Sequence, residues 1–143
     1  MGADLTVYYD GACPLCRREI AHYRGRAGAE RVRFVDLAAA EGREPGRLDP
    51  GSIDLGPGLD LAAARARFHV READGRLVSG AAAFARLWRR FPGWRWLARL
   101  VELQLFGWRP LLPFAEAAYR LSLIVRPWLA RRLRDTHCDE ACR

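Results

Sequence analysis

Two cysteines near the start of the chain have the spacing of a redox-active dithiol. Pro14 and Leu15 separate Cys13 from Cys16. On a helix, two cysteines three positions apart can bring their sulfurs within bonding distance. The thiolate is the reactive form of cysteine, and the positive end of a helix favours it. If a helix begins at Cys13, we expect this residue to attack a substrate sulfur and Cys16 to resolve the mixed disulfide. Such a dithiol exchanges electrons with a thiol or disulfide substrate, protein or small molecule, and we expect no cofactor.

The residues around this pair suit that chemistry. Pro14 fits the first helical position, because the N–H that proline lacks has no helical partner there. Arg17 lies in the first turn of the expected helix and adds a positive charge, and Gly11 allows the backbone to turn tightly beside the sulfurs. We expect Asp10 either to accept backbone N–H bonds in the turn or to take the proton from Cys16.

Two other interpretations of the same cysteines remain open. Free cysteines are often small buried hydrophobes with no reactivity. Alternatively, Cys13 and Cys16 with Cys138 and Cys142, beside His137, offer the ligand types of a tetrahedral zinc site. The chain would then be a non-enzymatic zinc-binding or helical interaction module. Three roles remain open for Cys138 and Cys142 as a pair: a second dithiol that relays electrons, a structural disulfide, or part of a free chain end.

Other classes of function have less support. An aspartate after a first strand suggests a phosphatase nucleophile, but such enzymes usually carry a second aspartate where this chain has Ala12. No glycine-rich phosphate loop is present. The net charge of +7 comes from 24 arginines against 17 acids without a long basic run, so we expect no nucleic-acid partner. The first ten residues do not resemble a signal peptide, so we expect a cytoplasmic location.

The elements that position the cysteines follow from hydrophobic periodicity and from turn residues. We expect strands at 5–9, 32–36, 67–72 and 76–79, helices at 13–25, 59–65 and 80–91, and a loop rich in glycine and proline at 42–58. This β-α-β-α-β-β-α order, with a CxxC motif after the first strand, predicts an α/β, thioredoxin-like sheet domain over residues 1–91.

Residues 92–143 predict an appended C-terminal helical segment that packs with this domain as one unit. Apolar periodicity indicates helices over 94–106 and 114–134, separated by Pro110 and Pro113, with a kink at Pro127. No stretch is long and apolar enough to span a bilayer alone. Two uses of residues 94–134 remain open: a helical layer on the domain, or a surface rich in arginine and tryptophan that makes peripheral contact with a membrane or a partner.

The segment Tyr8-Tyr9-Asp10-Gly11-Ala12-Cys13-Pro14-Leu15-Cys16 resembles the signature of the DCC family of predicted thiol-disulfide oxidoreductases, which is named for an Asp and two Cys. The similarity extends to the segments 73–76, 80–91 and 92–97, to Tyr119-Arg120, and to the cysteine-bearing tail. The resemblance implies a thioredoxin-like fold with Asp10, Cys13 and Cys16 as the functional set.

One feature departs from the wider thioredoxin pattern. Those proteins place a cis-proline just before the strand that faces the CxxC, whereas residues 59–66 contain no proline. The usual docking edge for a substrate peptide is therefore altered. We expect either an unusual or small substrate, or poor activity as a general reductase.

Overall fold

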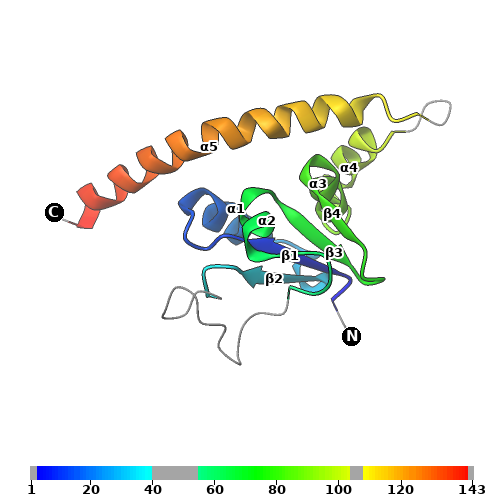
Figure 1. Ribbon diagram of the computed structural model, residues 1–143, viewed down its shortest axis with the longest axis horizontal. Helices are drawn as coiled ribbons and strands as arrows, with labels where there is room; N and C mark the ends of the chain where they lie inside the picture. The colour runs from blue at the N-terminus through cyan, green and yellow to red at the C-terminus, as the bar shows by residue number, and fades with distance from the viewer. Residues whose placement is uncertain (1–2, 40–54, 104–107, 142–143) are drawn as a thin grey trace.

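A mixed β-sheet lies at the centre of the N-terminal part of the chain (Figure 1). The computed structural model describes residues 3–39, 55–103 and 108–141, with side chains up to residue 132. In these residues the sheet has four strands, β1 (Leu5–Tyr9), β2 (Val32–Asp36), β3 (His69–Glu72) and β4 (Leu77–Ser79), in the order β2-β1-β3-β4. Strand β1 pairs parallel with β2 and antiparallel with β3, and β4 pairs antiparallel with β3.

The helices follow the strands in the expected order. They are α1 (Pro14–Arg24), α2 (Leu61–Ala66), α3 (Gly80–Trp88), α4 (Arg95–Val101) and α5 (Leu111–Ala141), with short 3-10 turns η1 (Ala29–Arg31) and η3 (Pro92–Trp94). The predicted mixed α/β architecture is confirmed. The main differences are at element ends: α2 begins at Leu61 because Asp60 caps it, accepting the N–H of Ala63 at 2.7 Å, and α3 ends at Trp88. Most of the predicted 42–58 loop lies outside the described residues.

Strand β1 is buried on both of its faces, which fixes the chain just before the cysteines. Leu5, Val7 and Tyr9 point into one cluster, with residues of α1, β3 and α3. Tyr8 points the other way, into a second cluster that includes Ala64 of α2. A strand covered on both faces is apolar along most of its length, and in β1 the half-buried Thr6 is the one residue without an apolar or aromatic side chain.

The C-terminal helix α5 is longer than the sequence pattern indicated. It begins at Leu111 instead of Phe114, because Pro113 falls in the first turn, where a missing N–H costs nothing. It also continues through Pro127. The expected helix over 94–106 is represented by α4, which ends at Val101, and residues 104–107 lie outside the described residues.

Helix α5 runs across one side of the domain, where it contacts α1, α3 and α4 (Figure 1). The carboxylate of Glu116 pairs with Arg67 and accepts the backbone N–H of Ala81 at 3.0 Å. Several large apolar side chains of α5 face outward, with Phe114 73% and Ile124 74% exposed. Within the described part of the chain, no helix combines the length and the apolar character that crossing a membrane requires.

Candidate functional site

The two cysteines stand at the N-terminal end of α1. Cys13 is the residue that precedes the first helical position, which Pro14 occupies, so the predicted start of this helix is confirmed. The carbonyl of Cys13 accepts the N–H of Arg17 at 3.0 Å. Both cysteines are half-buried free thiols, and they lie 3.4 Å apart. Disulfide formation therefore needs only a small approach of the two sulfurs.

Asp10 and Gly11 shape the turn between β1 and α1. The Asp10 carboxylate accepts the N–H of Ala12 at 3.0 Å, and the Asp10 carbonyl accepts the N–H of Cys13 at 3.1 Å. Gly11 donates its N–H to Oδ1 of Asp36 at 2.9 Å, and a Cβ at Gly11 would lie 2.1 Å from Oδ2 of Asp36. Gly11 lies in the turn, as expected. Its lack of a side chain also leaves space for the Asp36 carboxylate, which sequence reasoning did not identify.

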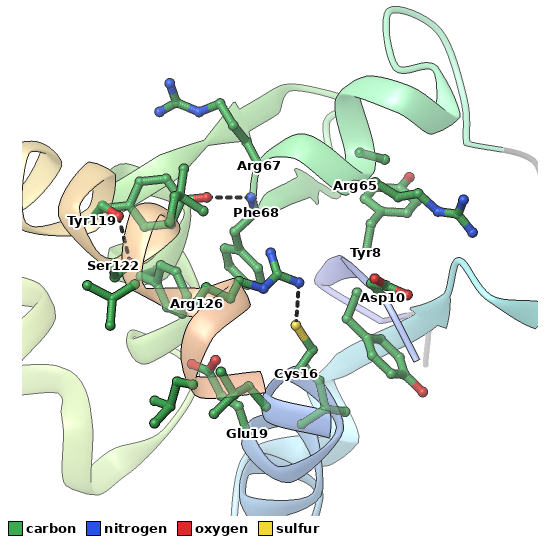
Figure 2. Close-up of a pocket in the computed structure, with 18 residues that line it drawn as sticks. Tyr8, Asp10, Cys16, Glu19, Arg65, Arg67, Phe68, Tyr119, Ser122 and Arg126 are labelled. Carbon is green, nitrogen blue, oxygen red and sulfur yellow. Dashed lines mark hydrogen bonds between the residues drawn. The ribbon is translucent and has the colours of Figure 1, made fainter. Parts of the chain in front are cut away.

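The guanidinium that acts on the cysteines comes from α5. Arg126 donates from Nη2 to Sγ of Cys16 at 2.6 Å, across 110 residues of sequence (Figure 2). Arg17, the arginine expected to support the pair, has an exposed side chain. Sequence reasoning missed Arg126, since nothing in the local pattern links it to the CxxC motif.

The pKa values of the two thiols shift in opposite directions. Burial raises the pKa of Cys16 from 9.0 to about 12, and the neighbouring Cys13 and Asp10 add to this effect against the opposing charge of Arg126. Burial also acts to raise the pKa of Cys13. Hydrogen bonds from the Cys16 backbone, from Arg126 and from the Cys16 thiol outweigh it, and the pKa falls below 9.0. Cys13 is therefore the more readily ionised thiol.

A cavity of about 370 Å³ opens beside Cys16. Its walls come from the end of β1, from α1, α2 and α3, from the segment between α2 and β3, and from α5. Figure 2 shows the Arg126 guanidinium directed at the Cys16 sulfur, whereas those of Arg65 and Arg67 extend away from it. Cys16 and Arg126 therefore form one edge of the cavity.

The backbone just before β3 is engaged by α5. The described residues contain no cis peptide bond, and the residue that precedes β3 is Phe68. Its N–H donates to the hydroxyl of Tyr119 at 2.6 Å, and its ring stacks on Phe84 with the ring centres 4.1 Å apart. This segment borders the cavity.

The second cysteine pair lies outside what the structure describes. Cys142 and the side chains of Cys138 and His137 belong to the undescribed part. The relay, disulfide and zinc interpretations of these residues therefore stay predictions. Among the side chains that are described, no group of three histidine, cysteine or acidic residues is placed to hold a metal ion.

Comparison with known proteins agrees with the geometry of this site. Residues 7–132 match the family model of the DCC1-like thiol-disulfide oxidoreductases. An uncharacterised chloroplast protein of Arabidopsis thaliana is 28% identical over 125 residues, covering 86% of this chain. The chain spans 54% of the length of that relative. No solved structure matches. The family match covers most of the sequence, including both cysteines, and the chain therefore belongs to the DCC1-like thiol-disulfide oxidoreductase family.

Proposed function

We propose that this protein carries out thiol–disulfide exchange, with Cys13 as the nucleophile and Cys16 as the resolving thiol. The observation that carries the proposal is a pair of free cysteines 3.4 Å apart whose pKa values shift in opposite directions. The sheet order β2-β1-β3-β4, with the dithiol at the turn from β1 to α1, supports a thioredoxin-like fold.

The exchange proceeds in two displacements. The Cys13 thiolate attacks one sulfur of a substrate disulfide, a Cys13–substrate disulfide forms, and the other substrate sulfur leaves as a thiolate. Cys16 then loses its proton and attacks the Cys13 sulfur, which expels the second substrate thiolate. The substrate gains two electrons, and the protein ends with a Cys13–Cys16 disulfide.

The guanidinium of Arg126 is suited to both displacements. Its charge favours the thiolate form of each cysteine, and its hydrogen bond to Cys16 stabilises negative charge on the resolving sulfur. Such charge-assisted hydrogen bonds are the stronger class in proteins. A thiol with a pKa of about 12 is rarely ionised at neutral pH, so assistance at Cys16 matters most in the second displacement.

Single-cysteine variants test the order of the two displacements. Cys16→Ser should accumulate a mixed disulfide between Cys13 and a small disulfide substrate, because nothing remains to resolve it. Cys13→Ser should form little adduct at neutral pH. Intact and peptide mass spectrometry after acid quenching measures both. Equal adduct formation at either cysteine, or none at Cys13, would contradict the proposal.

We also propose that the outward face of α5 makes peripheral contact with membranes. Large apolar side chains are exposed along it at Phe114, Leu121, Ile124 and Trp128. The Arg132 guanidinium lies 4.4 Å from the centre of the Trp128 ring. Aromatic and aliphatic side chains combined with arginine favour an anionic lipid surface.

A further inference from the structure

We propose that the cavity beside Cys16 binds the apolar body of a low-molecular-weight disulfide and makes such compounds better substrates than protein disulfides. This inference rests on the proposed function, because it names the substrate class of the same site. It stands on the composition of the cavity wall, on the placement of its polar groups and on the contacts of α5.

The wall of the cavity is mainly aliphatic and aromatic. The apolar side chains come from four helices and from the segment before β3; they include Leu15, Ile20, Ala64, Phe68, Phe84, Leu123 and Leu129. A volume of about 370 Å³ lies in the range of sites for small ligands. An apolar group placed there removes both its own surface and the wall from water, which is favourable.

Cys16 and the Arg126 guanidinium form the edge of the cavity at which a disulfide can react. Cys16 lies in the wall with the Arg126 guanidinium 2.6 Å from its sulfur. Arg65 and Arg67 point away from this sulfur (Figure 2), and Arg67 pairs with Glu116. A disulfide group therefore fits at the cysteine edge, and its substituent fits against Phe68 and Phe84.

Helix α5 restricts the approach of an extended peptide. Peptides that add to a sheet edge do so through free backbone N–H and C=O groups. The N–H of Phe68 is already bonded to the Tyr119 hydroxyl at 2.6 Å. One turn closer to the N-terminus of α5, the Glu116 carboxylate accepts the N–H of Ala81 and so attaches this turn to the start of α3. One backbone N–H beside the cavity is therefore unavailable to a peptide.

In this reaction the reduced dithiol is the electron donor. Cys13 attacks the disulfide R–S–S–R and releases one R–S⁻, which takes up a proton. The second R–S remains bound to Cys13 until Cys16 displaces it, and R lies in the cavity during this interval. One substrate gains two electrons per protein disulfide formed, and repeated turnover requires an external dithiol reductant such as dithiothreitol.

Rate comparison of three disulfides tests the inference. Pre-reduced protein is mixed with dibenzyl disulfide, cystine or insulin, and formation of the Cys13–Cys16 disulfide is followed by thiol trapping. The rate constant for oxidation of the protein by each disulfide is divided by the rate constant for oxidation of dithiothreitol by the same disulfide. This ratio removes differences in the intrinsic reactivity of the three disulfides. We expect the normalised value for dibenzyl disulfide to exceed the other two by at least about tenfold, equivalent to about 1.4 kcal/mol. Equal values, or faster oxidation by insulin, would overturn the inference.

A matched pair of variants locates the effect in the cavity. Leu123 lines the cavity, whereas Leu121 is 62% exposed and does not. Leu123→Trp should reduce the rate of oxidation by dibenzyl disulfide by about tenfold and leave the rate of oxidation by cystine unchanged. Leu121→Trp should change neither rate. If Leu123→Trp lowers the melting temperature, Leu129→Trp is used in its place, because Leu129 lines the same cavity. Identical behaviour of the cavity and surface variants would refute the assignment.

The two proposals fail in different ways. Normal oxidation of Cys13 and Cys16 in a glutathione buffer, without preference among the three disulfides, refutes the cavity assignment alone. Absence of a Cys13–Cys16 disulfide under every oxidant refutes the proposed function, and the cavity assignment with it.

Discussion

Arg126 and the two cysteines lie together at the proposed reactive centre. Arg126 contacts the Cys16 sulfur at 2.6 Å and contributes to lowering the pKa of Cys13. It comes from a helix that begins almost a hundred residues after Cys13. The proposed reactivity of the dithiol thus depends on the docking of α5 as well as on the start of α1.

Removal of the Arg126 charge should slow the reaction of Cys13. Arg126→Gln leaves a shorter polar side chain without the charge, so the Cys13 pKa should rise toward its ordinary value. Alkylation of Cys13 by iodoacetamide at pH 7 should slow by about tenfold, since a hydrogen bond to a charged group contributes about 1.5–3 kcal/mol. Arg17→Gln is the matched control and should have a smaller effect. Equal effects of the two variants would show that Arg126 has no special role.

The two thiols should show different pH profiles. Thiolate, the reacting species, increases as pH rises through the pKa of each cysteine. As the pH rises, Cys13 should therefore reach half of its maximal reactivity at a pH lower than 9.0, and Cys16 only near pH 12. Alkylation rates measured on Cys16→Ser and Cys13→Ser give the two profiles separately. Reaction of Cys16 at a lower pH than Cys13 would reverse the assignment of nucleophile and resolving thiol.

Gly11 should tolerate no side chain. A Cβ there would lie 2.1 Å from Oδ2 of Asp36, whose other oxygen accepts the N–H groups of Gly11 and Ala38. Gly11→Ala should lower the free energy of unfolding by about 1–3 kcal/mol, as overpacking does. The control is Gly93→Ala, where a Cβ meets nothing within 4 Å. Urea denaturation measures both, and equal stability of the two variants would contradict this explanation.

At the scale of elements, the junction of β1 and α1 holds the site and is also where sequence reasoning succeeded. The alternating β-branched and aromatic residues of β1, the turn at Asp10 and Gly11, and the proline at the first helical position are all local signals. The bounds of β1 and β2 followed from the pattern of their residues. Arg126, Asp36 and the Tyr119 contact could not be predicted, because each depends on packing between segments far apart in sequence.

The Tyr119 hydroxyl should contribute measurably to the docking of α5. Tyr119→Phe removes the acceptor of the Phe68 N–H and leaves the ring in place. An unsatisfied buried N–H costs about 1–3 kcal/mol, and this bond is only partly buried, so the free energy of unfolding should fall by about 1 kcal/mol. Ser122→Ala on the same helix removes an exposed hydroxyl that bonds only within α5 and should change stability little. Similar losses in both variants would indicate a general effect on the helix.

At the scale of the molecule, α5 has two different sides. One side docks on the domain through Glu116, Tyr119 and Arg126. The other exposes large apolar residues to solvent. The sequence pattern left a helical layer and a surface-binding helix as alternatives, and the arrangement of α5 is compatible with both roles at once.

Vesicle binding tests the outer side of α5. The protein should co-sediment with vesicles that contain anionic lipid, and less with neutral vesicles, because the exposed face combines apolar and arginine side chains. Ile124→Glu, at a position 74% exposed, should reduce binding without altering oxidation of the dithiol. Ile124→Leu keeps an apolar side chain at the same position and is the control. Equal binding by all variants would exclude this face as the contact surface.

The most direct test of the central claim is a redox titration of the reduced protein in glutathione buffers, with thiol trapping and peptide mass spectrometry. We predict a reversible disulfide between Cys13 and Cys16 with a midpoint in the range of about −120 to −270 mV that known dithiol exchangers cover. A pair that never forms this disulfide, or forms it only after a metal is chelated, would contradict the account.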